Sequence, residues 1–128
     1  MSKYQIADAI EQARYIIQDT RTGSYRHSDD KMLDYFNAAI STAWYLRPDV
    51  FLEENVTGSL WGSPPRYLRS DLGDDFPLED QFFQAVVTYM AGMVGLGDDE
   101  YAVDGRAVTL VGHLERVLVG RRSVAGRQ

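Results

Sequence analysis

Cysteine and histidine, which often serve as nucleophiles, proton carriers or zinc ligands, are scarce in this 128-residue chain. There is no cysteine, and the two histidines are His27 and His113. Disulfides and thiol nucleophiles are therefore excluded, and most zinc sites are too, because they need cysteines or several histidines. A relay between a histidine and Ser24 or Ser28 would need a base and an orienting group that the sequence does not indicate. We expect both histidines to have surface or packing roles.

Carboxylates are the other chemically capable groups. The run Asp98-Asp99-Glu100 offers oxygen ligands, but it lacks the spacing and the turn glycine of a calcium loop. Helix capping explains these residues better. Paired carboxylates for hydrolysis stay open as a weak alternative, because nineteen acidic residues offer many pairs and no pattern places two in an apolar pocket. We expect no catalytic residue, no metal, no cofactor and no enzymatic activity.

Charge is distributed unevenly along the chain. Residues 71–104 carry nine acidic residues and no basic one, whereas residues 105–128 carry five basic residues and one acidic residue. The net charge of −6 argues against wrapping duplex DNA, which needs clustered Lys and Arg. No apolar run approaches the roughly 20 residues of a membrane span, and the N-terminus has no signal-peptide pattern. We expect a soluble, intracellular protein with no membrane contact.

Helical periodicity dominates the sequence. Apolar residues recur at spacings of three and four in four segments, at about 2–18, 28–47, 77–97 and 98–120. We expect an all-α fold, a four-helix bundle of two helical hairpins. The length suits one domain, residues 1–120, followed by an extended and flexible basic C-terminal tail, residues 121–128.

Local signals define the ends of the first two helices. Ser2 and Gln5 predict a capping box before the first helix, and Ser28 predicts the N-cap of the second. Pro48 ends the second helix, because the residue before a proline is pushed out of helical geometry. The inner stripes of these two helices are predicted to contain Ile6, Ile10, Ala13, Ile17, Leu33, Phe36, Ile40, Ala43 and Trp44.

The other two helices are separated by glycines. Gly95 and Gly97 are predicted to end the third helix, and Asp98 to cap the fourth. Gly105 and Gly112 weaken the expected continuity of the fourth helix. The inner stripes are predicted to contain Phe82, Val86, Tyr89, Met93, Val103, Ala107, Leu110, Leu114 and Val117.

A long connection, at about residues 49–76, lies between the second and third helices. Three glycines and two prolines interrupt any long helix or strand in it. Connections of this length are uncommon in compact domains and are usually functional. We expect a loop that faces a partner, with a short hairpin as the alternative.

Several aromatic residues exceed the needs of a small core. Trp44 and Tyr45 are neighbours on a helix and point in different directions, so at least one should leave the core. Tyr15 raises the same question on the first helix. For any single one of these residues, the alternative is that its ring covers the outside of the core and has no partner. Together with Trp61 and Tyr67, these residues favour subunit contacts, where Trp and Tyr are enriched.

Three segments, in this order, resemble the head-to-tail adaptor (connector) family of tailed bacteriophages: ARYIIQDT, YRHSDDKMLDYFNAAISTAWYLRPDVF and FPLEDQFFQAVVTYMAGMVGLGDDEYAVDGRA. The resemblance lies in the combination of an Ala-Arg-hydrophobic-Gln-Asp helix end, a serine-capped helix ending in Arg-Pro-Asp, and a Pro-Leu start of a tyrosine-containing helix. An Asp-rich helix junction completes it. This chain differs in its middle, where that family often has a larger, strand-containing insertion.

The resemblance implies a structural virion protein, a helical protomer of a ring, typically a dodecamer, beneath the portal at the head-tail interface. Its partners would be the portal protein, a tail or head-closure protein and its own copies, and DNA would pass through the channel without sequence-specific binding. It would occupy the host cytoplasm during assembly and the virion afterwards. Some of the acids between Asp71 and Asp104 would face the channel, because negative charge repels phosphate.

Site residues follow from the same resemblance. The portal-binding residues would be the arginines of the tail: Arg121, Arg122 and Arg127. The residues facing the tail component or a neighbour would lie in the long loop: Trp61, Arg66 and Tyr67. A small helical regulator or antitoxin-like protein-binding module is the alternative function. It would be a small closed oligomer and would need a basic or grooved face, which the sequence does not indicate.

Overall fold

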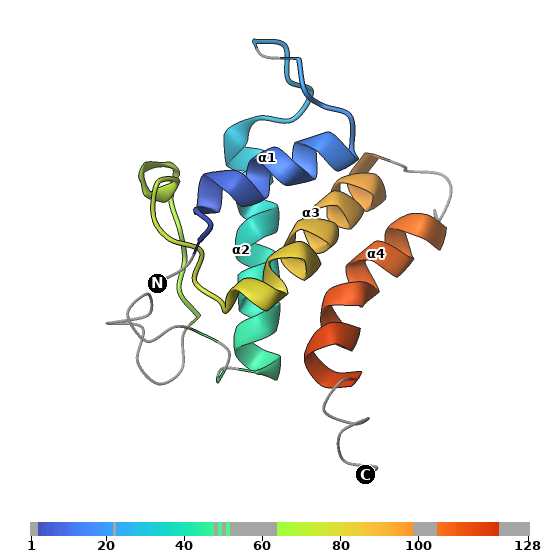
Figure 1. Ribbon diagram of the computed structural model, residues 1–128. Helices are drawn as coiled ribbons and strands as arrows, with labels where there is room; N and C mark the ends of the chain where they lie inside the picture. The colour runs from blue at the N-terminus through green and yellow to red at the C-terminus, as the bar shows by residue number, and fades with distance from the viewer. Residues whose placement is uncertain are drawn as a thin grey trace.

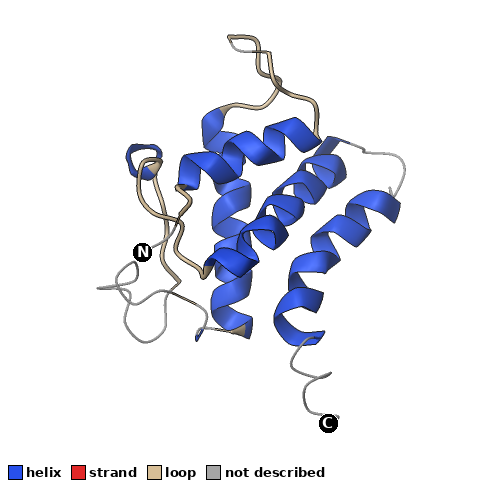
Figure 2. Ribbon diagram, in the orientation of Figure 1, coloured by secondary structure: helices blue, strands red, loops and turns tan. Residues whose placement is uncertain are grey.

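The computed structural model describes residues 3–21, 23–47, 49, 51, 64–98 and 105–120. Within these residues the protein is all-α, as predicted, and contains no strand. Figures 1 and 2 show its helices. They are α1 (Ile6–Ile16), α2 (Asp29–Leu46), α3 (Phe83–Asp98) and α4 (Gly105–Glu115), with short 3₁₀ turns η3 (Arg69–Asp71) and η4 (Asp80–Phe82) and a π-helical turn η5 (Arg116–Gly120). None of the helices described here is long and apolar enough to span a membrane.

The start of α2 confirms the predicted cap. The Lys31 amide donates to Ser28 Oγ at 3.1 Å, and Asp29 and Asp30 occupy the first turn, where the helix dipole favours negative charge. At α1 the predicted capping box involves Ser2, which lies outside the described residues. There the helix starts after Gln5, whose amide donates to the Asp8 carboxylate at 2.8 Å.

Helix α3 is the centre of the fold. It packs against α1, α2 and α4, and in Figure 1 it lies between α1 and α4. Buried side chains therefore occur on more than one side of it: Ala85, Val86, Val87, Tyr89, Met90, Ala91 and Val94. The predicted inner stripes of α1 and α2 are confirmed by the burial of Ile6, Ile10, Ala13, Leu33, Phe36, Ile40 and Ala43.

The prediction for the junction between the third and fourth helices was wrong. Helix α3 continues through Gly95 and Gly97 to Asp98, and α4 begins at Gly105, so Asp98 ends one helix instead of capping the next. The lack of a side chain at a glycine lowers helix propensity by about 1 kcal/mol, and packing of α3 on three neighbours outweighs this cost.

The C-terminal helix changes its pitch. Leu114 is fully buried, as predicted, and Val117 is half-buried and packs against the core. Leu118, one residue further on in the π-helical turn η5, is fully buried and was not predicted. Arg47 Nη1 donates to the Leu118 carbonyl at 3.0 Å and so ties this turn to the end of α2.

Tyr67 lies in the core, which corrects its expected role as a loop residue facing a partner. Its side chain is 8% exposed, and its ring packs edge-on against Phe36 with 5.8 Å between ring centroids. The cause is Asn37, whose side-chain amide donates to the Tyr67 carbonyl while its Oδ1 accepts from the Tyr67 N–H, both at 2.9 Å. Two hydrogen bonds from the Asn37 side chain to the Tyr67 backbone thus hold this segment against α2.

The Tyr67 hydroxyl is buried without a hydrogen-bond partner among the residues described. Burial, with help from Asp74 and Asp71, raises the pKa of Tyr67 well above its usual value. Asn37→Ala should lower the free energy of unfolding by about 2–4 kcal/mol, because it leaves the N–H and carbonyl of Tyr67 unpaired. Tyr67→Phe should leave it unchanged or raise it by up to about 1 kcal/mol.

Urea unfolding followed by far-UV circular dichroism would measure both variants. An equal loss in Asn37→Ala and Tyr67→Phe would contradict this assignment, because it would mean that the hydroxyl has an important partner.

Candidate functional site

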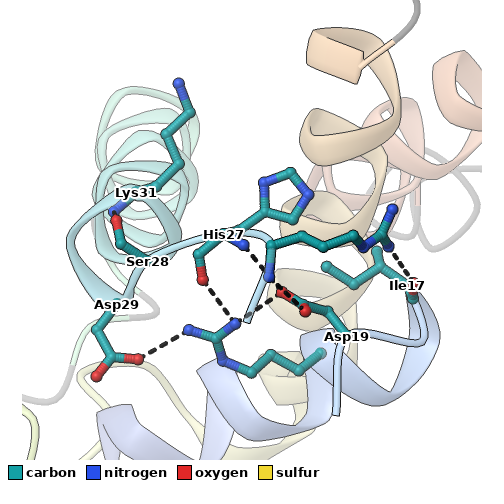
Figure 3. Close-up of polar contacts among 8 residues, drawn as sticks. Ile17, Asp19, His27, Ser28, Asp29 and Lys31 are labelled. Atoms are coloured by element: carbon teal, nitrogen blue, oxygen red, sulfur yellow. Dashed lines mark hydrogen bonds and ion pairs between the residues drawn. The ribbon is translucent and has the colours of Figure 1, made fainter. Parts of the chain in front are cut away.

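A buried arginine organises the connection between α1 and α2. Arg14 is on the last turn of α1 and is 4% exposed. Its guanidinium bonds Asp19 at 2.9 Å, Asp29 at 2.8 Å and the His27 carbonyl at 2.8 Å (Figure 3). The Tyr25 ring covers it at 3.9 Å. A buried charge needs such pairing, because an unpaired one would carry a desolvation penalty of several kcal/mol.

Asp19 is the second centre of this network and is 3% exposed. Burial alone would raise its pKa, but the amides of Arg26 and His27 and the Arg14 guanidinium outweigh burial, so its pKa lies below the usual value. The two amides reach the carboxylate at 2.8 and 3.1 Å. In Figure 3 the Asp19 carboxylate lies close to the labelled His27. Asp19 thus connects Arg14 to the turn that precedes α2.

The chain reaches this position through a left-handed residue. Gln18 has a φ of +59°, and the Asp19 amide donates to the Arg14 carbonyl at 2.9 Å while the Gln18 amide donates to Tyr15 at 3.2 Å. This is the Schellman arrangement of a helix C-terminus, which usually has glycine in the left-handed position. A non-glycine residue there costs roughly 1 kcal/mol, and the Asp19 contacts offset this cost.

A surface hollow of about 350 Å³ opens above Arg14. It is formed between α1, the α1–α2 connection and the segment before α3, and it is lined by Ala7, Ile10, Glu11, Arg14, Tyr15, Thr20, Tyr25, Asp29 and Leu72. Two carboxylates neutralise the guanidinium. The hollow is lined by both polar and apolar side chains, and its guanidinium is already paired.

Metal binding has no evident place here. Across the described part of the chain, no group of three or more His, Asp or Glu residues is arranged to hold an ion.

The predicted subunit-contact residues have different surroundings. Tyr15 is 57% exposed at the rim of the hollow, and Tyr45 is 70% exposed near the end of α2. Trp44 is half-buried and packs edge-on against Phe51, 5.2 Å between centroids. The structure does not bring the two tyrosines together. Tyr15 lies at the connection that leads into the start of α2, whereas Tyr45 lies near the end of α2, and this 18-residue helix is about 27 Å long.

The remaining predicted contact residues lie in the loop and the tail. Arg66 is exposed, beside the buried Tyr67. The other residues lie outside the described part of the chain: Trp61, Arg121, Arg122 and Arg127.

Sequence reasoning missed the Arg14–Asp19 network. A usable signal existed, because Arg14 follows Ile10 by one helical turn and lies beside the apolar stripe of α1, where a charge needs a buried partner. Asp29 was interpreted only through the helix dipole, although it also binds Arg14. The choice of Asp19 as the partner depends on the left-handed Gln18, which no local pattern indicates.

Comparisons with models of known protein families, with curated proteins and with solved structures find no match for this chain.

The acid stability of the protein should depend on Asp19. The pKa of Asp19 is lower in the folded protein than its unfolded value of about 3.9. The ionised carboxylate therefore stabilises the fold fully above the unfolded pKa, and this stabilisation is lost as the pH falls through the folded pKa. Asp19→Asn should lower the free energy of unfolding at neutral pH by about 3 kcal/mol and flatten its decline below about pH 5.

Urea unfolding at a series of pH values would measure this effect. Asp30→Asn is the matched control, an exposed acid at the start of α2 whose loss should cost under about 1 kcal/mol. An unchanged acid slope in Asp19→Asn would assign the pH dependence to other carboxylates.

Proposed function

We propose that this chain is a structural virion protein of a tailed phage, an adaptor that forms a ring between portal and tail and leaves a channel for DNA. The proposal rests on the resemblance of its motif order to the head-to-tail adaptors. The all-α fold agrees with that resemblance. In this role the chain contributes surfaces for assembly and no catalytic chemistry.

In this proposal the protomer is a four-helix bundle of two hairpins, α1–α2 and α3–α4. Two features of the packing support it. Helix α3 contacts all three of the other helices, and the Arg14 network fixes the first hairpin at its turn. The ring would be a dodecamer by the same resemblance.

The observation that carries the proposal is the exposure of large aromatic side chains on helices whose buried faces are already complete. Tyr15 and Tyr45 are 57% and 70% exposed, whereas α1 and α2 bury Ile10 and Ile40 in the core. In the single chain both rings are left mostly exposed to water, which is unfavourable for apolar surface. Aromatic residues of this kind are enriched in the centres of protein interfaces.

The DNA channel would be lined by acidic residues of the segment before α3. Asp75, Glu79 and Asp80 are half-buried in this segment. Carboxylates that face a duplex repel its phosphates and so let it slide. The positions from Asp99 to Asp104 fall outside the described residues.

The alternative is a small helical regulator or antitoxin-like binding module. The hollow above Arg14 is the feature that favours it, because such a module needs a grooved face. The experiment below separates the two functions by the partner that is bound.

Negative-stain imaging of the protein with and without the portal encoded beside it would test the adaptor role. We expect an added ring at the narrow end of the portal, absent after deletion of residues 121–128, whose three arginines would bind the portal. Tyr45→Ser should weaken the ring, because it removes an exposed aromatic contact, and Thr88→Ser on α3 is a matched control. No ring and no comigration with the portal would favour the regulator.

A further inference from the structure

The turn after the long loop presents an apolar side chain beside acidic ones. Leu68 is 59% exposed, although it precedes the η3 turn at the edge of the core. Its amide donates to the Asp71 carboxylate at 2.7 Å, and the Asp74 amide donates to the Asp71 carbonyl at 2.9 Å. These bonds close a compact turn, residues 68–74, which holds Leu68 and the exposed Asp74 on a fixed backbone.

The outer side of the C-terminal helix has the opposite charge. Thr109, Arg116 and Val119 are exposed, and Val119 is 44% exposed. Arg116 Nη2 donates to the Thr109 carbonyl at 3.2 Å, so this side chain lies back along the helix. Gly112 makes room for it, since a Cβ there would lie 3.1 Å from Arg116 Nη1. The guanidinium is therefore held in place before any partner arrives, which lowers the entropy cost of binding.

These two surfaces lie on opposite flanks of the molecule. Figure 1 shows α4 and η5 at the right edge and the segment before α3 at the left edge. Their charges complement each other. Residues 71–80 contain five acidic residues and no basic one, whereas residues 105–120 contain two arginines and one glutamate. On one flank the exposed Leu68 thus lies near the negative Asp74, and on the other the exposed Val119 lies near the positive Arg116.

We propose that the α4–η5 flank of one copy binds the 68–74 turn of the next copy. Val119 would pack on Leu68, and Arg116 would pair with the Asp74 carboxylate. This contact rests on the ring proposed above and specifies its interface. Because the two surfaces differ and lie on opposite flanks, the contact is heterologous, which is the type that closes into a ring.

Other charges face the same turn. Arg66 is exposed just before it and Arg69 is exposed within it, and Arg69 lies 4.0 Å from Asp29, which is already bound to Arg14. Glu115 is exposed next to Arg116 on the other flank. Arg66 is positive and Glu115 is negative, so these two residues would attract each other across the same contact.

Disulfide cross-linking would test the contact directly, because the chain has no cysteine of its own. Leu68→Cys and Val119→Cys replace exposed side chains and should fold normally. On oxidation at high protein concentration, a mixture of the two variants should give a heterodimer, and the double variant should give a ladder of oligomers. Val119→Cys with Tyr25→Cys is the control, since Tyr25 is exposed on the α1–α2 connection.

Cross-linking of Leu68→Cys with Val119→Cys no stronger than this control would overturn the proposal. So would a predominance of Leu68→Cys or Val119→Cys homodimers, because these require like surfaces to meet. Imaging with the portal separates the two proposals. A ladder of oligomers without a ring on the portal would support the contact and contradict the adaptor role. A ring on the portal without the ladder would contradict this contact alone.

Charge exchange gives a second readout in the same cross-linking variants. Arg116→Glu in both partners, or Asp74→Lys in both, should lower the cross-link yield by about tenfold, because like charges then meet. Combining Arg116→Glu in the Val119→Cys partner with Asp74→Lys in the Leu68→Cys partner should restore it. Asp34→Lys, an exposed acid on α2, should have no effect in place of Asp74→Lys. If the single charge exchanges lower the cross-link yield and the combined exchange does not restore it, Arg116 and Asp74 do not meet.

Discussion

The fold depends on the need to cover α3. Between Asp80 and Asp98 the chain has no charged residue, so this helix cannot turn a broad face to water without a penalty. The other three helices all pack on it. Close packing by three neighbours also offsets the low helix propensity of the glycines inside α3, Gly92 and Gly95.

The Arg14–Asp19 pair sets how α1 leads into α2. A buried ion pair is weak evidence for added stability, because desolvation offsets much of its Coulomb attraction. Its evident effect here is geometric. Asp19 binds the amides of Arg26 and His27, just before the Ser28 cap, so the end of α1 fixes the start of α2. That position places Tyr15 near the start of α2, whereas Tyr45 lies near its end.

Sequence reasoning was most accurate where the structure is local. Ser28 caps α2 and the inner residues of α1 and α2 are buried, because capping and helical periodicity depend on neighbours in the chain. It was wrong at Asp98, which ends α3 and does not cap α4, and it missed the burial of Tyr67. Those positions depend on the packing of α3 and on a pair of hydrogen bonds that span thirty residues. Of the aromatic contact residues, Tyr15 and Tyr45 are exposed, whereas Trp44 and the buried Tyr67 contribute to the packed interior.

The anchoring of Tyr67 bears on how such a chain can change during evolution. Asn37 holds the backbone of Tyr67, and Phe51 forms an isolated bridge with Leu78, so the segment between Phe51 and Tyr67 has two independently fixed ends. The entropy of closing a loop rises only slowly with its length. Insertions between these ends would leave the core unchanged, so lineages could acquire a new projecting module here without redesigning the bundle.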